Sequence, residues 1–133
     1  MPRAEITDLY RIEDSLTPEE KAARNLVAQF VDRDYLPIVG QHFRTGTFPT
    51  EVIPKLAELG VVGATLHGYG CAGMNNVSYG LILQELERGD SGLRSFASVQ
   101  SSLCMYPIAE FGSDEQKDRF LPGMAKGKII GCF

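Results

Sequence analysis

The chain has 133 residues, of which 44% are hydrophobic and 23% are charged, a balance typical of a soluble globular domain with a substantial core. The net charge of −4 argues against nucleic acid or an anionic membrane as the main partner. No apolar stretch reaches membrane-spanning length, and the first residues lack the pattern of a signal or transit peptide. Cys71, Cys104 and Cys132 form no C-x-x-C pair, which argues against disulfides and a zinc site and predicts a reducing, cytoplasmic location.

The first predicted helix begins at Pro18. Thr17 supplies a cap, Pro18 fits the first helical position, and Glu20 completes a capping box. Apolar residues at helical spacing continue the helix to Tyr35. Pro37 is expected to bend or break it before helical structure resumes, because proline lacks the N–H that a helix interior needs.

Two further helices are predicted in the middle of the chain. Residues 45–47 form a turn, after which Pro49 opens a helix that Gly60 ends. Residues 75–88 carry apolar side chains at helical spacing, and Gly89 ends that helix before the next one begins. Both helices are therefore expected to contribute to the core.

The last part of the chain changes character. Ser113 begins a second capping box and a helix through Phe120, whereas the run after Gly127 is strand-like and would need a sheet partner that this chain does not supply. We expect an all-α array of about five or six helices over 16–127, an amino-terminal extension over 1–15, and a strand-like start of a further domain over 128–133.

The segment Gly68–Gly73 reads G-x-G-x-x-G and precedes a helix. A dinucleotide-binding fold would also need a second strand that ends in an acidic residue about twenty positions later. The region around Asp90 instead predicts a boundary between two helices, so we interpret the glycines as a loop. No metal-ligand cluster or nucleophile–base pair stands out, and we expect no metal and no catalytic residue in this chain.

The helix that starts near Asp90 carries one guanidinium among short side chains. Its polar stripe consists of Arg94, Ser98, Ser101 and Ser102, with Ser95 at the edge. The side expected to face the core consists of Leu93, Phe96, Ala97 and Leu103. An arginine with few charges nearby needs an anion, which is either Asp90 four residues earlier on the helix or a bound ligand.

Several motifs resemble a known family. They are Asp90-Ser91-Gly92-Leu93-Arg94-Ser95, Ser98-Val99-Gln100-Ser101-Ser102-Leu103, Phe111-Gly112-Ser113-Asp114-Glu115-Gln116 and Gly131-Cys132-Phe133. In this order they resemble the amino-terminal helical domain of acyl-CoA dehydrogenases, most closely glutaryl-CoA dehydrogenase, from about Leu16 onward. Gly89 departs from the pattern, since relatives usually carry a larger apolar residue there.

The resemblance implies an FAD-dependent enzyme that oxidises and decarboxylates glutaryl-CoA to crotonyl-CoA. It implies that Arg94 and Ser95 bind the terminal carboxylate of the substrate and that Ser98 and Val99 lie beside the acyl chain. The catalytic base and most flavin contacts belong to other domains of the family, so the chain alone is expected to be inactive and to retain no FAD. An electron-accepting flavoprotein and a homo-oligomer are the implied partners.

Two alternatives remain. The enzyme acts on another short-chain acyl-CoA and Arg94 pairs with Asp90, or the chain is a non-catalytic helical interaction module whose apolar surface serves a partner protein.

Overall fold

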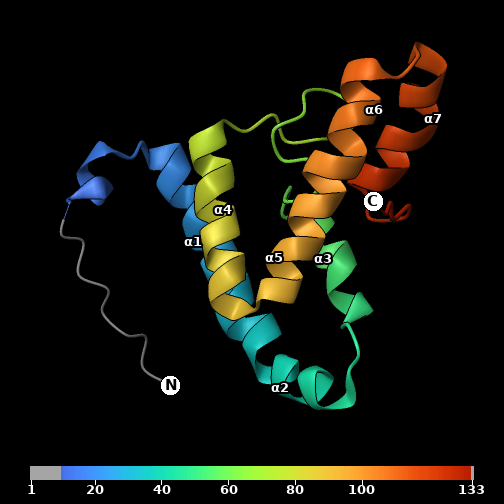
Figure 1. Ribbon diagram of the computed structural model, residues 1–133. Helices are drawn as coiled ribbons and strands as arrows, with labels where there is room; N and C mark the ends of the chain where they lie inside the picture. The colour runs from blue at the N-terminus through green and yellow to red at the C-terminus, as the bar shows by residue number, and fades with distance from the viewer. Residues whose placement is uncertain (1–9, 133) are drawn as a thin grey trace.

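The computed structural model describes residues 10–132 and contains seven α-helices (Figure 1). They are α1 Pro18–Phe30, α2 Leu36–Thr45, α3 Ile53–Glu58, α4 Asn76–Gly89, α5 Ser91–Ser98, α6 Tyr106–Phe111 and α7 Asp114–Ala125. Short 3-10 helices, η1 Ile12–Ser15 and η3 Thr50–Val52, and π-helical turns, η2 Val31–Tyr35 and η4 Val99–Met105, complete the helical structure. The described residues contain no β-strand, so the all-α prediction is confirmed.

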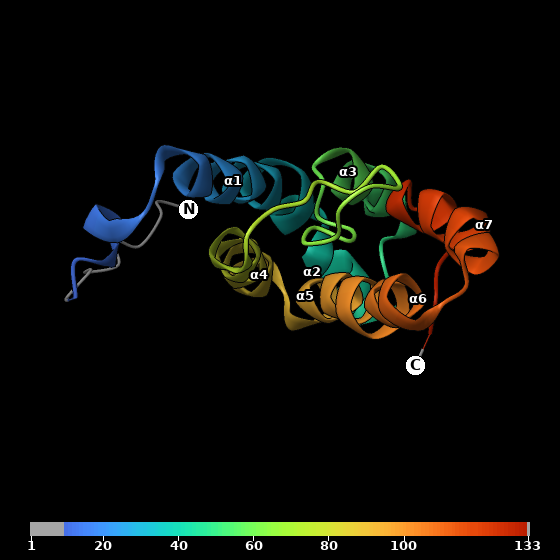
Figure 2. The ribbon, with the colours of Figure 1, turned by 90° about the horizontal axis from the view of Figure 1, so that it is seen from above.

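The π-turns join several helices into longer rods. η2 links α1 to α2, and η4 links α5 to α6, so the seven helices form five continuous rods. α1 packs against α4, α4 against α5, and α6 against α7. Figure 2 shows α1, α3 and α7 along one side of the molecule and α4, α5 and α6 along the other.

Capping side chains fix the beginnings of the helices. Thr17 Oγ1 accepts from the backbone N–H of Glu20 at 3.3 Å, and Glu20 Oε2 accepts from that of Thr17 at 2.8 Å, which confirms the predicted capping box. Ser113 begins α7 with a second box, also as predicted. Glu20 Oε1 accepts from Asn75 Nδ2 at 2.8 Å, and Asn75 caps α4. The Glu20 carboxylate thus ties the start of α1 to the start of α4. The hydrogen bond from the backbone N–H of Thr17 lowers the pKa of Glu20.

The predicted interruption near Pro37 takes the form of a π-turn. η2 widens the helix by one residue in the turn just before α2, and Pro37 lies in the first turn of α2. Pro37 has no N–H to donate to the preceding turn, and the wider hydrogen-bonding pattern of the π-turn accommodates this missing bond. Gly46 then ends α2 in the left-handed conformation, at φ 64°, as the predicted turn requires.

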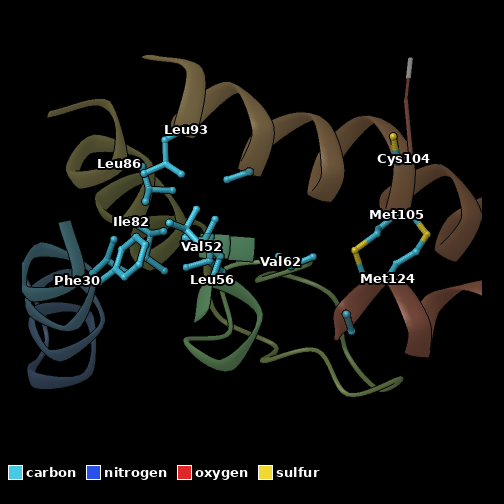
Figure 3. Packing of buried hydrophobic residues seen from close by; sticks show 14 of the residues in the cluster. Phe30, Val52, Leu56, Val62, Ile82, Leu86, Leu93, Cys104, Met105 and Met124 are labelled. Carbon is cyan, nitrogen blue, oxygen red and sulfur yellow. The ribbon is translucent and has the colours of Figure 1, made fainter. Parts of the chain in front are cut away.

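The core runs between the two sides of the molecule. At one end it joins four helices through Phe30, Leu56, Ile82, Leu86 and Leu93 (Figure 3). At the other end Cys104, Met105 and Met124 bring η4 and α7 together, and Cys104 is a buried free cysteine.

Gly89, the residue that departs from the family pattern, lies where α4 crosses η2. A Cβ on Gly89 would lie 2.9 Å from Val31 Cγ1 and 3.4 Å from the ring of Tyr35. The small residue therefore permits close packing between α4 and η2.

Most of the predicted extension, residues 1–9, and the last residue, Phe133, lie outside the described residues. The strand expected from residue 128 does not form up to residue 132, because no partner strand lies beside it in the described part of the chain. Within residues 10–132, none of the helices combines the length and apolarity needed to span a bilayer, and no three metal-ligating side chains meet.

The glycine-rich segment before α4 is an irregular loop, and it leads into the helix as the sequence indicated. Gly63, in the turn that leads into this loop, adopts φ +67°, and a Cβ there would lie 2.6 Å from Met105 Cε and 2.9 Å from Cys71 Sγ. Glycine at this position serves both the backbone conformation and the packing of the loop on η4.

We predict that Gly63→Ala destabilises the fold far more than Gly46→Ala. Both glycines have positive φ, so each alanine costs about 1 kcal/mol of backbone strain. Gly46 has nothing within 4 Å of the added Cβ, whereas Gly63→Ala also overpacks Met105, which costs about 1–3 kcal/mol more. Urea denaturation measures both free energies of unfolding, and equal losses would contradict the packing argument.

Candidate functional site

The candidate site is built on α5, and Asp90 sets where that helix begins. Asp90 Oδ2 accepts from the backbone N–H of Leu93 at 3.0 Å and from the hydroxyl of Tyr35 at 3.2 Å. Burial and the neighbouring Asp90 carboxylate raise the pKa of Tyr35 to about 12, so the phenol stays a neutral donor at physiological pH. α5 therefore starts where the sequence predicted, and Tyr35 on η2 holds its capping residue, Asp90, in place.

Arg94 does not pair with Asp90, which corrects that alternative. Its Nε donates to Glu87 Oε2 at 2.7 Å, across the junction between α4 and α5. Ser91 Oγ donates to the other oxygen of Glu87 at 2.5 Å. Both contacts lower the pKa of Glu87, and the hydrogen bond from Ser91 has the larger effect, followed by the one from Arg94. Asp90 is unavailable because its carboxylate caps α5.

The rest of the Arg94 guanidinium is less engaged. Nη1 donates to Ser98 Oγ at 3.4 Å, and Nη2 makes no hydrogen bond to any residue in the described range 10–132. The side chain is 37% exposed. Glu87 and Ser98 thus orient the guanidinium and leave Nη2 available to a ligand.

A pocket of about 320 Å³ lies beside α5. Its wall is almost entirely apolar and comes from three parts of the chain: Phe48, Gly92, Ser95, Phe96, Val99, Gln100 and Gly131. The rings of Phe48 and Phe96 lie with their centroids 5.3 Å apart. Such a cavity suits a short apolar group with one hydroxyl beside it.

The four residues predicted to bind substrate fall into two pairs. Ser95 and Val99 line the pocket together, one helical turn apart. Arg94 and Ser98 form a second pair, linked by their hydrogen bond on the neighbouring stripe of the same rod. Ser98 Oγ also donates to the carbonyl of Ser95 at 3.1 Å, which connects the two pairs. Their role in binding substrate stays a prediction.

The sequence predicted that the polar stripe continues to Ser101 and Ser102, but in the structure it ends at Ser98. Ser101 turns inward, where its Oγ accepts from the backbone N–H of Gly63 at 3.0 Å. Ser102 lies outside and shares a hydrogen bond with the hydroxyl of Tyr79 at 3.1 Å. Leu103, expected in the core, is 43% exposed. The cause is η4, because a π-turn adds a residue per turn and rotates the later side chains out of register.

Sequence reasoning missed Gln100, a pocket residue that is 1% exposed. Both ends of its amide are hydrogen-bonded: Nε2 donates to the carbonyl of Ile129 and Oε1 accepts from the N–H of Gly131, both at 2.9 Å. The sequence held only an indirect signal for this role. The strand-like run after Gly127 has no partner strand, so its backbone groups need hydrogen bonds from a side chain.

The pocket beside α5 is a poor match for a flavin ring. The pocket wall is apolar, and the one amide in it already serves the backbone of residues 129–131. An isoalloxazine ring needs several donors and acceptors, which this pocket wall does not offer, and the expected loss of FAD from the isolated chain stays a prediction.

Comparison with known proteins identifies the family. The model of the acyl-CoA dehydrogenase N-terminal domain matches residues 17–128. The chain belongs to this family. It is 34% identical over 122 residues to the short-chain-specific acyl-CoA dehydrogenase of Clostridium acetobutylicum, covering 90% of this chain and 32% of that relative.

Two solved structures show how closely the family fold is kept. A glutaryl-CoA dehydrogenase from Mycobacterium smegmatis in complex with FADH2 is 48% identical with a TM-score of 0.89, and the match covers 92% of this chain and 32% of that one. Butyryl-CoA dehydrogenase from Megasphaera elsdenii is 31% identical with a TM-score of 0.78, covering 86% and 31% respectively. The chain thus spans about a third of the length of these relatives.

We predict that Asp90→Ala lowers the free energy of unfolding by about 2–4 kcal/mol. The cap contributes about 1 kcal/mol, and the buried Tyr35 hydroxyl loses its partner at about 1–3 kcal/mol. Asp90→Asn is the matched control, because asparagine keeps a capping oxygen and should cost less than about 1 kcal/mol. A similar loss in both variants, measured by chemical denaturation, would mean that the negative charge and not the cap matters.

Proposed function

We propose that this chain is the acyl-binding part of an FAD-dependent glutaryl-CoA dehydrogenase, which oxidises and decarboxylates glutaryl-CoA to crotonyl-CoA. The observation that carries the proposal is the position of Arg94, immediately before pocket-lining Ser95 and with Nη2 available. The similarity to the Mycobacterium smegmatis glutaryl-CoA dehydrogenase supports the same substrate class.

In this proposal the pocket holds the acyl chain and Arg94 holds its far carboxylate. A guanidinium binds a carboxylate through charge-assisted hydrogen bonds, and Glu87 fixes the plane of the group before the ligand arrives. Ser95 offers a hydroxyl at the edge of the pocket, and Val99 packs along the acyl carbons. A substrate without the carboxylate would lack the contact to Nη2, which provides discrimination.

The complete enzyme would need groups that these residues do not supply. Bound FAD would accept the hydride in the oxidation, and the carboxylate base that takes the α-proton would come from another domain. This chain contributes binding and orientation. An electron-accepting flavoprotein, a homo-oligomer and a cytoplasmic location complete the proposal.

A second candidate is a dehydrogenase for another short-chain acyl-CoA. The observation that favours it is the ion pair between Arg94 and Glu87, because an arginine with a partner does not require a ligand. Over this region the chain is similar in sequence to the relative named short-chain-specific and similar in fold to the one named butyryl-CoA dehydrogenase. In this case the pocket keeps its role and Arg94 is structural.

The two candidates are separated by anaerobic titration of the flavoprotein expressed from the complete reading frame. Glutaryl-CoA and butyryl-CoA are added separately, and flavin bleaching is followed by absorbance. Preferential bleaching by glutaryl-CoA supports the first candidate. Bleaching by butyryl-CoA alone supports the second, and bleaching by neither refutes the first.

We predict that Arg94→Gln lowers the ratio of kcat/KM for glutaryl-CoA to that for butyryl-CoA about a hundredfold, which corresponds to losing one charge-assisted carboxylate contact. Arg33→Gln is the control, since that arginine is exposed and pairs with Asp34 on η2. A ratio that stays the same in both variants would assign Arg94 a structural role.

We also predict that residues 1–133 expressed alone purify without colour. The pocket beside α5 has an apolar wall without a set of flavin donors, so we expect FAD to be lost during purification. Absorbance near the flavin bands, compared with the protein from the complete reading frame, measures the retained cofactor. A yellow preparation would show that this chain holds FAD itself.

A further inference from the structure

Gln100 takes the place of a neighbouring strand for residues 129–131. Its side-chain amide donates to the carbonyl of Ile129 and accepts from the N–H of Gly131, both at 2.9 Å. In an extended chain these two backbone groups point to the same side, where an adjacent strand would normally meet them. One buried amide therefore satisfies both groups, and we call this contact the Gln100 clamp.

The segment is held at its other end as well. The N–H groups of Lys128 and Ile129 both donate to the carbonyl of Gly123 on α7, at 2.9 and 3.2 Å. Residues 128–131 are thus fixed between α7 and η4.

Close packing at Gly131 makes the clamp position sensitive. A Cβ on Gly131 would lie 2.8 Å from both Cβ and Sγ of Cys104, which is one turn after Gln100 on η4. Only a glycine lets the backbone come this near without displacing Cys104. The clamp and the glycine together set a short separation between the segment and η4.

The same two residues line the pocket. Gln100 and Gly131 are both part of its wall, together with Ser95 and Val99, which lie earlier on the α5–η4 rod. The separation between the segment and the rod is therefore one dimension of the pocket. Any movement of residues 129–131 away from η4 would widen it.

We infer that Gln100 is a positioning residue that sets the width of the acyl pocket by clamping residues 129–131 against η4. The inference rests on the proposed function for the identity of the ligand, a short unbranched acyl thioester. The clamp narrows the pocket, so a methyl branch on the acyl chain is disfavoured. Gln100 itself need not touch the reacting atoms.

The test compares Gln100→Leu with Gln84→Leu in the protein expressed from the complete reading frame. Gln84 is exposed on α4, so the control makes the same chemical change away from the pocket. Hydrogen exchange read by mass spectrometry reports on the Gly131 amide. Steady-state kinetics compare the acyl-CoA that bleaches the wild-type flavin with its methyl-branched analogue.

We expect faster exchange at Gly131 in Gln100→Leu, together with about a tenfold loss of the preference for the unbranched substrate in kcat/KM. Gln84→Leu should change neither quantity. Faster exchange with an unchanged preference would overturn the inference, since a purely structural clamp does not affect which acyl chain is accepted. Unchanged exchange would overturn the clamp itself.

Gly131→Ala provides a second route if Gln100→Leu does not fold. The alanine keeps the Gln100 amide but pushes the segment away from Cys104, so it should weaken the same preference. An unchanged preference there would also overturn the inference. If wild-type protein reacts with no acyl-CoA, the proposed function fails and the pocket role fails with it, while exchange at Gly131 still shows whether the clamp exists.

Discussion

The arrangement of the site depends on the carboxylate of Asp90. Asp90 follows the last residue of α4 in an extended conformation, at φ −172° and ψ 136°, and immediately caps α5. Its hydrogen bond from Tyr35 anchors the junction to η2, so the direction of α5 is fixed by the core. A Cβ on Gly92 would lie 2.7 Å from Asp90 Oδ2, which explains why a glycine follows two residues later. The turn at this junction brings Glu87 to Arg94.

Sequence reasoning located the helix beginnings because the signals there are local. The box formed by Thr17 and Glu20, the one begun by Ser113, and the cap at Asp90 each involve residues three apart in the chain. Local hydrogen bonds can be inferred from spacing alone. The fold class followed from the same signals together with apolar residues at helical spacing.

The features that residue spacing could not predict depend on contacts between distant parts of the chain. The π-turn η4 does not change the order of residues, but it moves Ser101 inward and Leu103 outward. The partner of Arg94 is seven residues away across a helix junction, where a rule for a single helix does not apply. The clamp joins Gln100 to residues 29 and 31 positions later. Each of these contacts is decided by how the rods pack.

The pairing of Arg94 with Glu87 changes how a carboxylate ligand would be recognised. A second carboxylate at the same guanidinium would meet the negative charge of Glu87, and this repulsion offsets part of its attraction to Arg94. Both side chains are partly exposed, so solvent screens the repulsion as well as the attraction. What the pair provides is orientation, because Nε is held and Nη2 is left to the ligand. Selectivity in the proposed site would therefore come from the angle at which a carboxylate meets Nη2 more than from the net charge.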